Sequence, residues 1–356
     1  MIHAACGSAR RASGRPAARR ALFCAVLLAA VLALSGCVPP TPDLGQSDAP
    51  VPTAAPEPTV APVPEPTPTP TPVPTPTPEP TVAPKPRPLR LDVRRVLADS
   101  LAIERFGVRP GGSGAEHRAA DYVAARMRAL GYTVRIEEFP VPAGTSRNVI
   151  ARMPGADPRV LVLGGHVDSK RGTLGANDDA AGCAILLEIA RVVKVRRPPV
   201  TVEFVFFGSE EYNDGKPRDH HWGSRYRVRR MSKAERRNTA GMISADVVGF
   251  GRNLYVRTMR VGPRTMSDHL LAEAHDLNVH LAYLKDPGPT GWSDHEPYEK
   301  AGIPAAWLER LQDPQYHKMG DTTAHLQKER LRESGQFLLD VVMRMDDDAL
   351  AKLGHH

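Results

Sequence analysis

The distribution of proline limits which part of this 356-residue chain can fold. Twenty of its 35 prolines lie between Pro39 and Pro88, a stretch without an aromatic residue. Such a segment cannot bury enough apolar surface to form a core, and its Pro-Thr repeats favour extended polyproline II. We therefore expect one folded domain over residues 89–356, preceded by a disordered linker over 37–88.

The N-terminus has the pattern of an export signal. An arginine-rich stretch leads into Ala21–Leu34, which is uncharged and too short to span a bilayer comfortably. It ends in Leu34-Ser35-Gly36-Cys37, which resembles the bacterial lipobox. We expect residues 1–36 to be a lipoprotein signal peptide, with Cys37 lipidated and the exported protein anchored to the bacterial cell membrane. The alternative is an ordinary signal anchor in which the cysteine is incidental.

Charge and cysteine content exclude several classes of function. The net charge is +7, but five of the arginines and no acidic residue lie in 1–36. The nearly balanced remainder gives no reason to expect a nucleic-acid partner. Cys183 is the one cysteine after residue 37. The folded region therefore has neither an internal disulfide nor a cysteine-based zinc site, and we expect Cys183 to be a small buried residue on a helix.

Helix and strand patterns alternate along residues 113–345. The continuous apolar run at 160–163 is typical of a strand buried on both faces. Ser113 and Glu116 have the spacing of a capping box ahead of a helix that ends near Gly131. Further strands are expected at 133–139, 148–153, 202–207, 242–245 and 303–308, and further helices at 180–195, 265–275 and 329–345. The alternation predicts an α/β fold, a three-layer α/β/α sandwich around a mixed, mostly parallel sheet.

Histidines and carboxylates follow the predicted strands. His166 and Asp168 come after the 160–163 run, and an Asp-Asp pair at 178–179 opens the next helix. The remaining residues of this kind follow three later strands: Glu210, Glu211, Asp246 and His317. Each motif alone has an ordinary structural interpretation, such as a helix cap or a solvated acidic pair. Because parallel strands bring their carboxyl ends to one edge, their joint occurrence predicts a shared site.

The residue types at this edge suit divalent metals. The candidate ligands comprise two imidazoles and three carboxylates, a set that favours zinc with manganese or cobalt as alternatives. They are His166, Asp178, Glu211, Asp246 and His317. Five ligands are too many for one tetrahedral zinc that keeps an open position, but they suit two ions if one carboxylate bridges. Two ions roughly 3.5–4 Å apart can hold a bridging water as hydroxide. The sequence therefore predicts a hydrolytic centre.

With these motifs the sequence resembles metallopeptidase family twenty-eight, the co-catalytic di-zinc aminopeptidases. The resemblance extends over about residues 93–342. Its strongest motifs are Gly-Gly-His-Val-Asp-Ser at 164–169, Gly-Ala-Asn-Asp-Asp-Ala-Ala-Gly at 175–182 and Gly-Ser-Glu-Glu at 208–211. Weaker matches are Ser-Asp-His at 293–295, Gly-Ile-Pro-Ala at 302–305, and Tyr-His followed by Asp-Thr at 316–322.

The resemblance implies two zinc ions per chain. By it, Asp178 bridges the ions, His166 and Asp246 complete one coordination shell, and Glu211 and His317 complete the other. The Asp178–Asp179 peptide bond is expected to be cis.

The resemblance also implies the catalytic residues. Glu210 is the general base, Asp168 orients His166, and Tyr316 donates to the tetrahedral oxyanion. Orientation of a metal-bound imidazole through its second ring nitrogen is a general need of such sites.

The sequence departs from the family pattern in the loops that line the pocket. The 212–222 loop is longer than usual and carries His220 and His221, which we interpret as surface residues rather than an additional metal ligand. Met319 and Gly320 stand where the family often has a proline. Ser293, Asp294 and His295 are neighbours that cannot form a catalytic triad on one short loop, so we interpret them as support for the pocket.

These observations predict an exported zinc exopeptidase, an aminopeptidase acting on peptides. Three alternatives remain open: a glutaminyl cyclase, which shares the fold but uses one zinc; a carboxypeptidase or other amide hydrolase; and a non-catalytic binding domain. The five-ligand set argues against the first, and the intact ligands and base argue against the last. The chain has no dinucleotide-binding or Walker A pattern, so we expect no cofactor besides the metals.

Overall fold

The computed structural model describes residues 88–211 and 220–354. The predicted signal peptide, Cys37 and almost the whole linker therefore lie outside the described residues. No helix within the described ranges is long and apolar enough to cross a bilayer.

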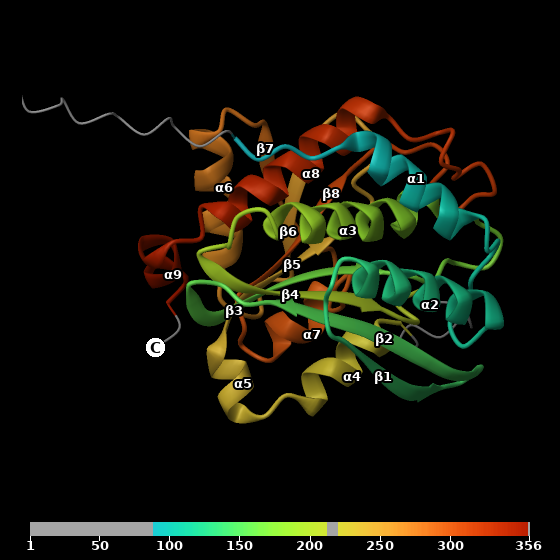
Figure 1. Cartoon of the computed structure of the whole chain (residues 1–356), viewed down its shortest axis with the longest axis horizontal. Coiled ribbons are helices and arrows are strands. Elements are labelled where there is room, and N and C mark those ends of the chain that lie inside the picture. The colour runs from blue at the N-terminus through green and yellow to red at the C-terminus, as the bar shows by residue number, and fades with distance from the viewer. Residues whose placement is uncertain (1–87, 212–219, 355–356) are drawn as a thin grey trace, which may run out of the picture. The chain divides into compact units, whose positions relative to one another are not determined.

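An eight-stranded sheet forms the centre of the described fold (Figure 1). Its spatial order is β1-β2-β4-β3-β5-β8-β6-β7. The strands are β1 (Val134–Val141), β2 (Gly144–Met153), β3 (Asp157–His166), β4 (Val200–Phe207), β5 (Thr239–Ala245), β6 (Leu254–Thr258), β7 (Leu281–Lys285) and β8 (Ala305–Arg310). The four central strands β4, β3, β5 and β8 are parallel, whereas β2 and β6 join them antiparallel. The sheet is thus mixed, as predicted.

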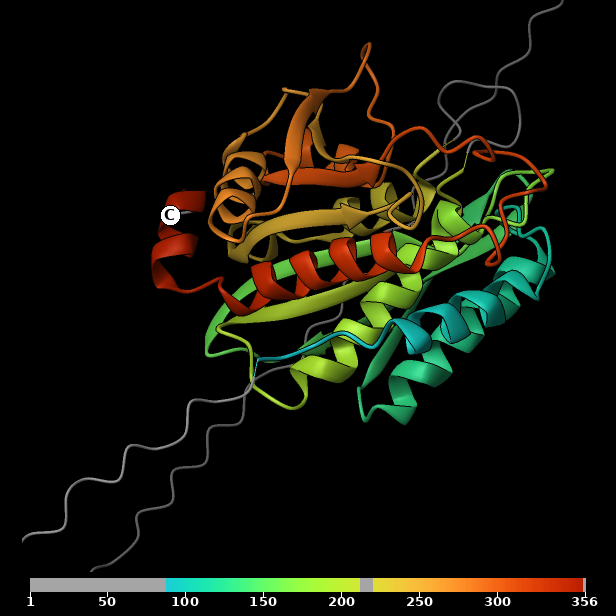
Figure 2. The same ribbon diagram turned by 90° about the horizontal axis from the view of Figure 1, so that it is seen from above.

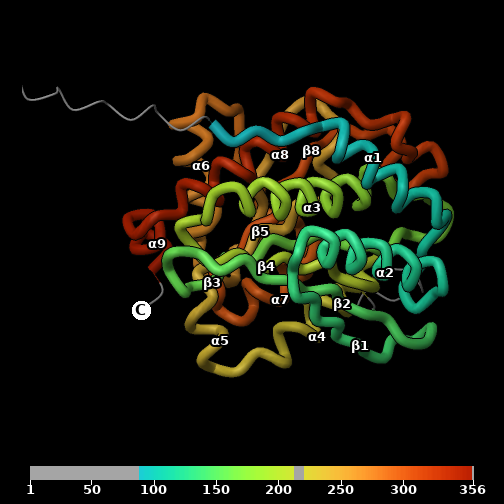
Figure 3. The backbone as a smooth tube through the Cα atoms, in the orientation of Figure 1, coloured from blue at the N-terminus to red at the C-terminus, as the bar shows by residue number. Residues whose placement is uncertain are grey.

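Helices cover both faces of the sheet. One face carries α1 (Val93–Glu104), α2 (Gly114–Ala129), α3 (Ala181–Val193), α6 (Thr265–Asp276) and α8 (Lys328–Met343). Figure 2 shows α1, α3 and α8 side by side over the strands. The other face carries α4 (Trp222–Arg230) and α7 (His295–Lys300), and α5 (Lys233–Asn238) packs near β3 and β5. The C-terminal helix α9 (Asp347–Leu353) packs against α6 (Figure 3).

The alternation of side chains along each strand builds two apolar layers. In β3, Leu161 and Leu163 join the cluster beneath α3, while Val160 and Val162 join the cluster beneath α7. Successive side chains of a strand point to opposite faces, so a run of apolar residues fills both layers at once. This confirms the predicted three-layer architecture and explains why the 160–163 run has no polar member.

The predicted elements agree with the structure, and the ends differ by a few residues. Ser113 caps α2 by accepting the backbone N–H of Glu116, at 3.2 Å. The capping box is only half formed, because the Glu116 carboxylate accepts the N–H of Gly112 and a hydroxyl from Ser146 instead. Cys183 is fully buried on α3, as expected.

Several helices and strands were not predicted from the sequence. They are α1, α4, α5, β6, β7, α7 and α9, and most are short or mainly polar. In α4 the apolar residues do not form a clear stripe, and β6 and β7 have five residues each. Such elements are stabilised by packing against the sheet rather than by a strong pattern of their own.

Candidate metal centre

The predicted metal ligands and the predicted base gather where the four central strands end. β4, β3, β5 and β8 are adjacent and parallel, so the loops after them share one edge of the sheet. Six of the predicted site residues lie at that edge: His166, Asp178, Glu210, Glu211, Asp246 and His317. Asp178 is not at a strand end itself but on η1 (Ala176–Ala180), the turn that leads into α3. The topology therefore brings together residues 150 positions apart in the chain.

Asp178 lies between the two histidines. Its Oδ1 is 3.1 Å from His166 Nε2, and its Oδ2 is 3.1 Å from His317 Nε2. Each carboxylate oxygen thus faces a different imidazole. Burial would raise the pKa of Asp178, but the two histidines outweigh it and lower the pKa. This is the geometry expected of a carboxylate that bridges two cations.

One further carboxylate joins each histidine. Asp246 Oδ1 is 3.6 Å from His166 Nε2, and Glu211 Oε1 is 3.6 Å from His317 Nε2. The structure therefore contains two groups that share Asp178, and within each group the candidate ligand atoms lie within 4.8 Å of one another. All five predicted ligands are brought together in the pairs that the family resemblance implied.

The chemistry of these side chains fits zinc. Among the described residues, Asp178 Oδ2 and Asp246 Oδ1 are buried and accept no hydrogen bond, and their neighbours are imidazole nitrogens at 3.1 and 3.6 Å. Burial raises the pKa of Asp246, and burial together with Asp178 and Glu210 raises that of Glu211. Buried carboxylates in such a group need compensating positive charge. Imidazole nitrogens with carboxylate oxygens are a donor set that zinc accepts.

Asp168 connects the candidate ligands with the Glu-Glu pair. Its Oδ1 is 3.4 Å from His166 Nδ1, the nitrogen that faces away from Asp178. The same carboxylate accepts the backbone N–H groups of Glu210 and Glu211, at 3.0 and 3.1 Å. The sequence placed Asp168 beside His166, but its contact with the pair after β4 emerged only from the fold.

Two further residues hold the loop of Asp178. Asp321 accepts the backbone N–H groups of Asn177 and Asp178, at 2.7 and 3.2 Å. The Asp178–Asp179 bond is cis, as expected.

Arg109 is fully buried and donates to four backbone carbonyls, including those of residues 167, 174 and 175. Sequence reasoning missed Arg109, because an arginine outside any motif gives no sign that it is buried.

A cavity of about 460 Å³ opens over this centre. Its lining comprises Lys170, Asp178, Glu210, Glu211, His220, His221, Asp246, Thr290, Gly291, Trp292, Tyr316 and His317. Tyr316 lies at the cavity with its ring stacked on His317, with 3.8 Å between ring centroids. Its role as an oxyanion donor stays a prediction, as do the roles of Glu210 and Asp168.

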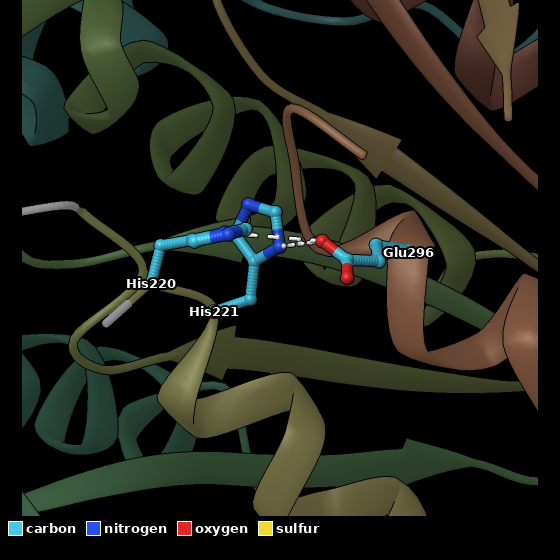
Figure 4. Close-up of side chains that lie close together, drawn as sticks. All are labelled: His220, His221 and Glu296. Carbon is cyan, nitrogen blue, oxygen red and sulfur yellow. Dashed lines mark hydrogen bonds and ion pairs between the residues drawn. The ribbon is translucent and has the colours of Figure 1, made fainter. Parts of the chain in front are cut away.

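The interpretation of His221 as a surface residue is wrong. Its exposed fraction is 2%, and its Nε2 lies 3.0 Å from Glu210 Oε1. His220 is partly buried beside it, with 4.0 Å between the ring centroids (Figure 4). Position in a long polar loop suggested exposure, whereas His221 is the N-cap residue of α4, which packs against α7, and its ring lies between Glu210 and Glu296.

Ser293, Asp294 and His295 do not form a triad, in agreement with the sequence analysis. Ser293 Oγ donates to Asp246 Oδ2 at 2.7 Å, and His295 Nε2 lies 2.8 Å from Asp286 Oδ2. Asp294 is fully buried, and burial together with Glu210 raises its pKa to about 8. The segment thus supports the candidate ligand Asp246 through the hydrogen bond from Ser293.

Comparison with known proteins agrees with the site. The sequence model described as peptidase family M28 matches residues 148–342. Aminopeptidase YwaD of Bacillus subtilis is 28% identical over 56% of this chain and 44% of its own length. The chain spans less than half the length of the first curated relatives that it matches.

Solved structures share the fold. A zinc aminopeptidase from Bacillus subtilis superposes with a TM-score of 0.67 at 18% identity, covering 74% of this chain and 97% of that one. A glutaminyl cyclase from an Acidobacteriales bacterium superposes with a TM-score of 0.66 at 20% identity, covering 75% and 99%.

Proposed function

The chain belongs to peptidase family M28, and from that membership we propose that it is a zinc-dependent aminopeptidase that removes N-terminal residues from peptides. The observation that carries the proposal is the placement of Asp178, whose two oxygens each lie 3.1 Å from a different histidine. A centre with one metal ion does not need a carboxylate shared in this way. We therefore propose two zinc ions per chain.

Each ion would have its own set of protein ligands. His166, Asp178 and Asp246 would hold one ion, and Asp178, Glu211 and His317 the other. When bound, zinc lowers the pKa of water and polarises a carbonyl oxygen. The protein supplies the shape of the cavity and the orientation of the ligands.

Glu210 is proposed as the base. Burial would raise its pKa, but His221 and His166 outweigh burial and lower it, which favours the ionised carboxylate. Its Oε2 lies 4.0 Å from His166 Nε2 and thus faces the centre. Tyr316, at the edge of the cavity, is proposed to donate to the oxyanion of the substrate.

Glutaminyl cyclisation is the second candidate, because a cyclase fold superposes as well as the aminopeptidase fold does. The complete set of five candidate ligands favours the aminopeptidase. The curated relatives include both aminopeptidases and glutaminyl-peptide cyclotransferases, so they do not separate these two activities. The aminopeptidase among them favours the amino end of the peptide over the carboxyl end.

The proposal can be tested with zinc-loaded protein and a panel of substrates. We expect close to two zinc ions per chain and hydrolysis of aminoacyl anilides and free peptides. N-acetylated versions of the same substrates are the matched control and should not be hydrolysed. One ion per chain together with pyroglutamate release from N-terminal glutaminyl peptides would show a cyclase instead.

Export and anchoring are a separate proposal, supported by the lipobox-like segment that ends in Cys37. A Cys37→Ser variant should leave the membrane fraction or remain unprocessed. If the variant and the wild type partition and migrate identically, the protein is not a lipoprotein.

A further inference from the structure

The two oxygens of the Glu210 carboxylate face different neighbours. Oε2 lies 4.0 Å from His166 Nε2, toward the candidate metal centre. Oε1 lies 3.0 Å from His221 Nε2, on the opposite side. Glu210 and His221 are both buried, with exposed fractions of 6% and 2%. Oε2 thus faces the candidate metal centre, while Oε1 contacts the ring of His221.

His221 is fixed at several points. Its ring Nδ1 lies 2.8 Å from Glu296 Oε2, so both ring nitrogens have a carboxylate partner (Figure 4). Its backbone N–H donates to the carbonyl oxygen of Glu210, at 2.7 Å. Its backbone has φ of 55°, in the left-handed region that few residues other than glycine and asparagine adopt. His221 is therefore held against Glu210 through its main chain as well as its ring.

Glu296 is itself restrained. It lies on α7 and is 1% exposed, and its Oε1 contacts Arg225 Nη2 at 3.3 Å as well as Lys300 Nζ. Its Oε2 lies 2.8 Å from His221 Nδ1 and 3.8 Å from His220 Nδ1. The three residues form a chain that begins on α7, passes through His221 and ends at the carboxylate after β4.

We propose that His221, held by Glu296, is a positioning residue that keeps the Glu210 carboxylate turned so that Oε2 faces the metal centre. The inference rests on the proposed function, because it takes Glu210 as the base. A base must lie within hydrogen-bond reach of the proton that it accepts, and an error of about 1 Å can lower the rate by roughly a hundredfold. A donor on Oε1 removes the rotation that would cause such an error.

A metal ion is the competing interpretation of the same cluster, since His220, His221 and Glu296 offer ligand atoms within 4.8 Å of one another. The surroundings argue against it. The Glu296 carboxylate is already compensated by two cationic side chains, Arg225 and Lys300. A further cation would be repelled by both, and repulsion is strong in a buried site.

Two substitutions of His221 test the contacts of its two ring nitrogens separately. A glutamine can place its amide N–H close to where histidine carries Nε2, and an asparagine close to where it carries Nδ1. His221→Gln therefore keeps a donor for Glu210, whereas His221→Asn keeps only the contact with Glu296. Asparagine also tolerates the left-handed backbone at this position.

The kinetic test compares zinc-loaded wild type with both variants. We expect His221→Asn to lower kcat by about 10–100-fold with little change in KM, and His221→Gln to retain most of kcat. Zinc content should be equal in all three proteins. The matched control is His269→Asn, at a buried histidine on α6 outside the cavity lining, which should leave kcat unchanged.

Each other outcome overturns the proposal. Wild-type kcat in His221→Asn means that Glu210 does not need the histidine. Equal loss in the Asn and Gln variants means that His221 has only a structural role. A third metal equivalent in the wild type that is missing from His221→Asn identifies the cluster as a metal site.

A crystal structure gives a readout that does not depend on activity. In the zinc-loaded wild type Glu210 should adopt one conformation with Oε1 hydrogen-bonded to His221, and in His221→Asn the carboxylate should rotate away. An unchanged Glu210 in that variant refutes the positioning role even if the wild type proves active. Absence of peptide hydrolysis by the wild type would refute the proposed function alone, and the structures would still decide the role of His221.

Discussion

The middle of β3 is apolar whereas the residues at its end are polar, and these two regions are built differently. In β3, Leu161 and Leu163 are fully buried among apolar side chains of the helical layer. A few residues later, His166 lies among buried carboxylates, two of which have oxygen atoms without a hydrogen-bond partner. The first region is stabilised by its own apolar contacts, whereas the second gathers buried carboxylates that a bound cation would stabilise.

This difference separates stability from activity. Apolar burial contributes roughly 25 cal/mol per Å² whether or not a ligand is present. A group of buried carboxylates contributes favourably only when its charges are compensated. Changes in the apolar layer should therefore alter the free energy of unfolding, and changes at the strand ends should alter metal binding and turnover.

The largest effect is expected from Glu210→Gln. Glutamine has nearly the same shape but cannot accept a proton, so kcat should fall by about 10²–10⁴-fold with normal zinc content. Glu211→Gln is the matched variant and should instead weaken binding of one zinc. Zinc titration and peptide hydrolysis on both proteins give the measurement. Zinc loss in Glu210→Gln with retention in Glu211→Gln would mean that the two roles are exchanged.

Leu163→Ala should show the opposite pattern. The side chain is fully buried, so its truncation should lower the free energy of unfolding by about 2–5 kcal/mol. Zinc content and kcat at 25 °C should stay close to those of the wild type. Chemical denaturation of the zinc-loaded proteins measures the change, with Leu284→Ala on the edge strand β7 as the milder control. A large fall in the kcat of Leu163→Ala without a lower free energy of unfolding would contradict the distinction between a stabilising apolar region and a catalytic polar one.

Asp168→Asn tests whether the strand ends act as a unit. Asparagine has one acceptor oxygen where Asp168 uses two to hold the backbone of Glu210 and Glu211. Loss of a partner behind a metal ligand typically costs 10–100-fold in metal affinity, and we expect about that loss. Competition with a chelator measures it. Asp157→Asn, at the start of the strand β3 that precedes Asp168, should leave zinc affinity unchanged, and an equal effect there would contradict the assignment.

The smallest effect is expected at Ser113, which belongs to neither region. Its hydroxyl caps α2, and Ser113→Ala should lower the free energy of unfolding by about 1 kcal/mol. Ser113→Asn keeps a capping oxygen and should remain close to the wild type. Thermal unfolding of both variants provides the measurement, and equal destabilisation by alanine and asparagine would show that the cap contributes nothing.

Much of the fold and all five candidate ligands could be predicted from the sequence. His166 is the last residue of β3, two glycines after an apolar run, and Asp246 directly follows β5, so each residue's place at a strand end is a local property. The rule that parallel strands present their ends at one edge then brings such residues together. Asp178 could be included because its Asp-Asp motif precedes a strongly apolar helix.

The sequence by itself thus determined strands β1 to β5 and β8, helices α2, α3, α6 and α8, the chemistry at the strand ends and the expected class of metal. Only the tertiary structure decided which residues contact the candidate base and hold the loops that carry the candidate ligands. His221 and Glu296 are 75 positions apart, and Arg109 meets carbonyl groups about 60 positions away. Such contacts depend on how α4, α7 and the loops pack on the sheet. The physical reason is that a side chain's place along a strand is set by its neighbours in sequence, whereas its partners across a buried interface are set by the packing of separate elements.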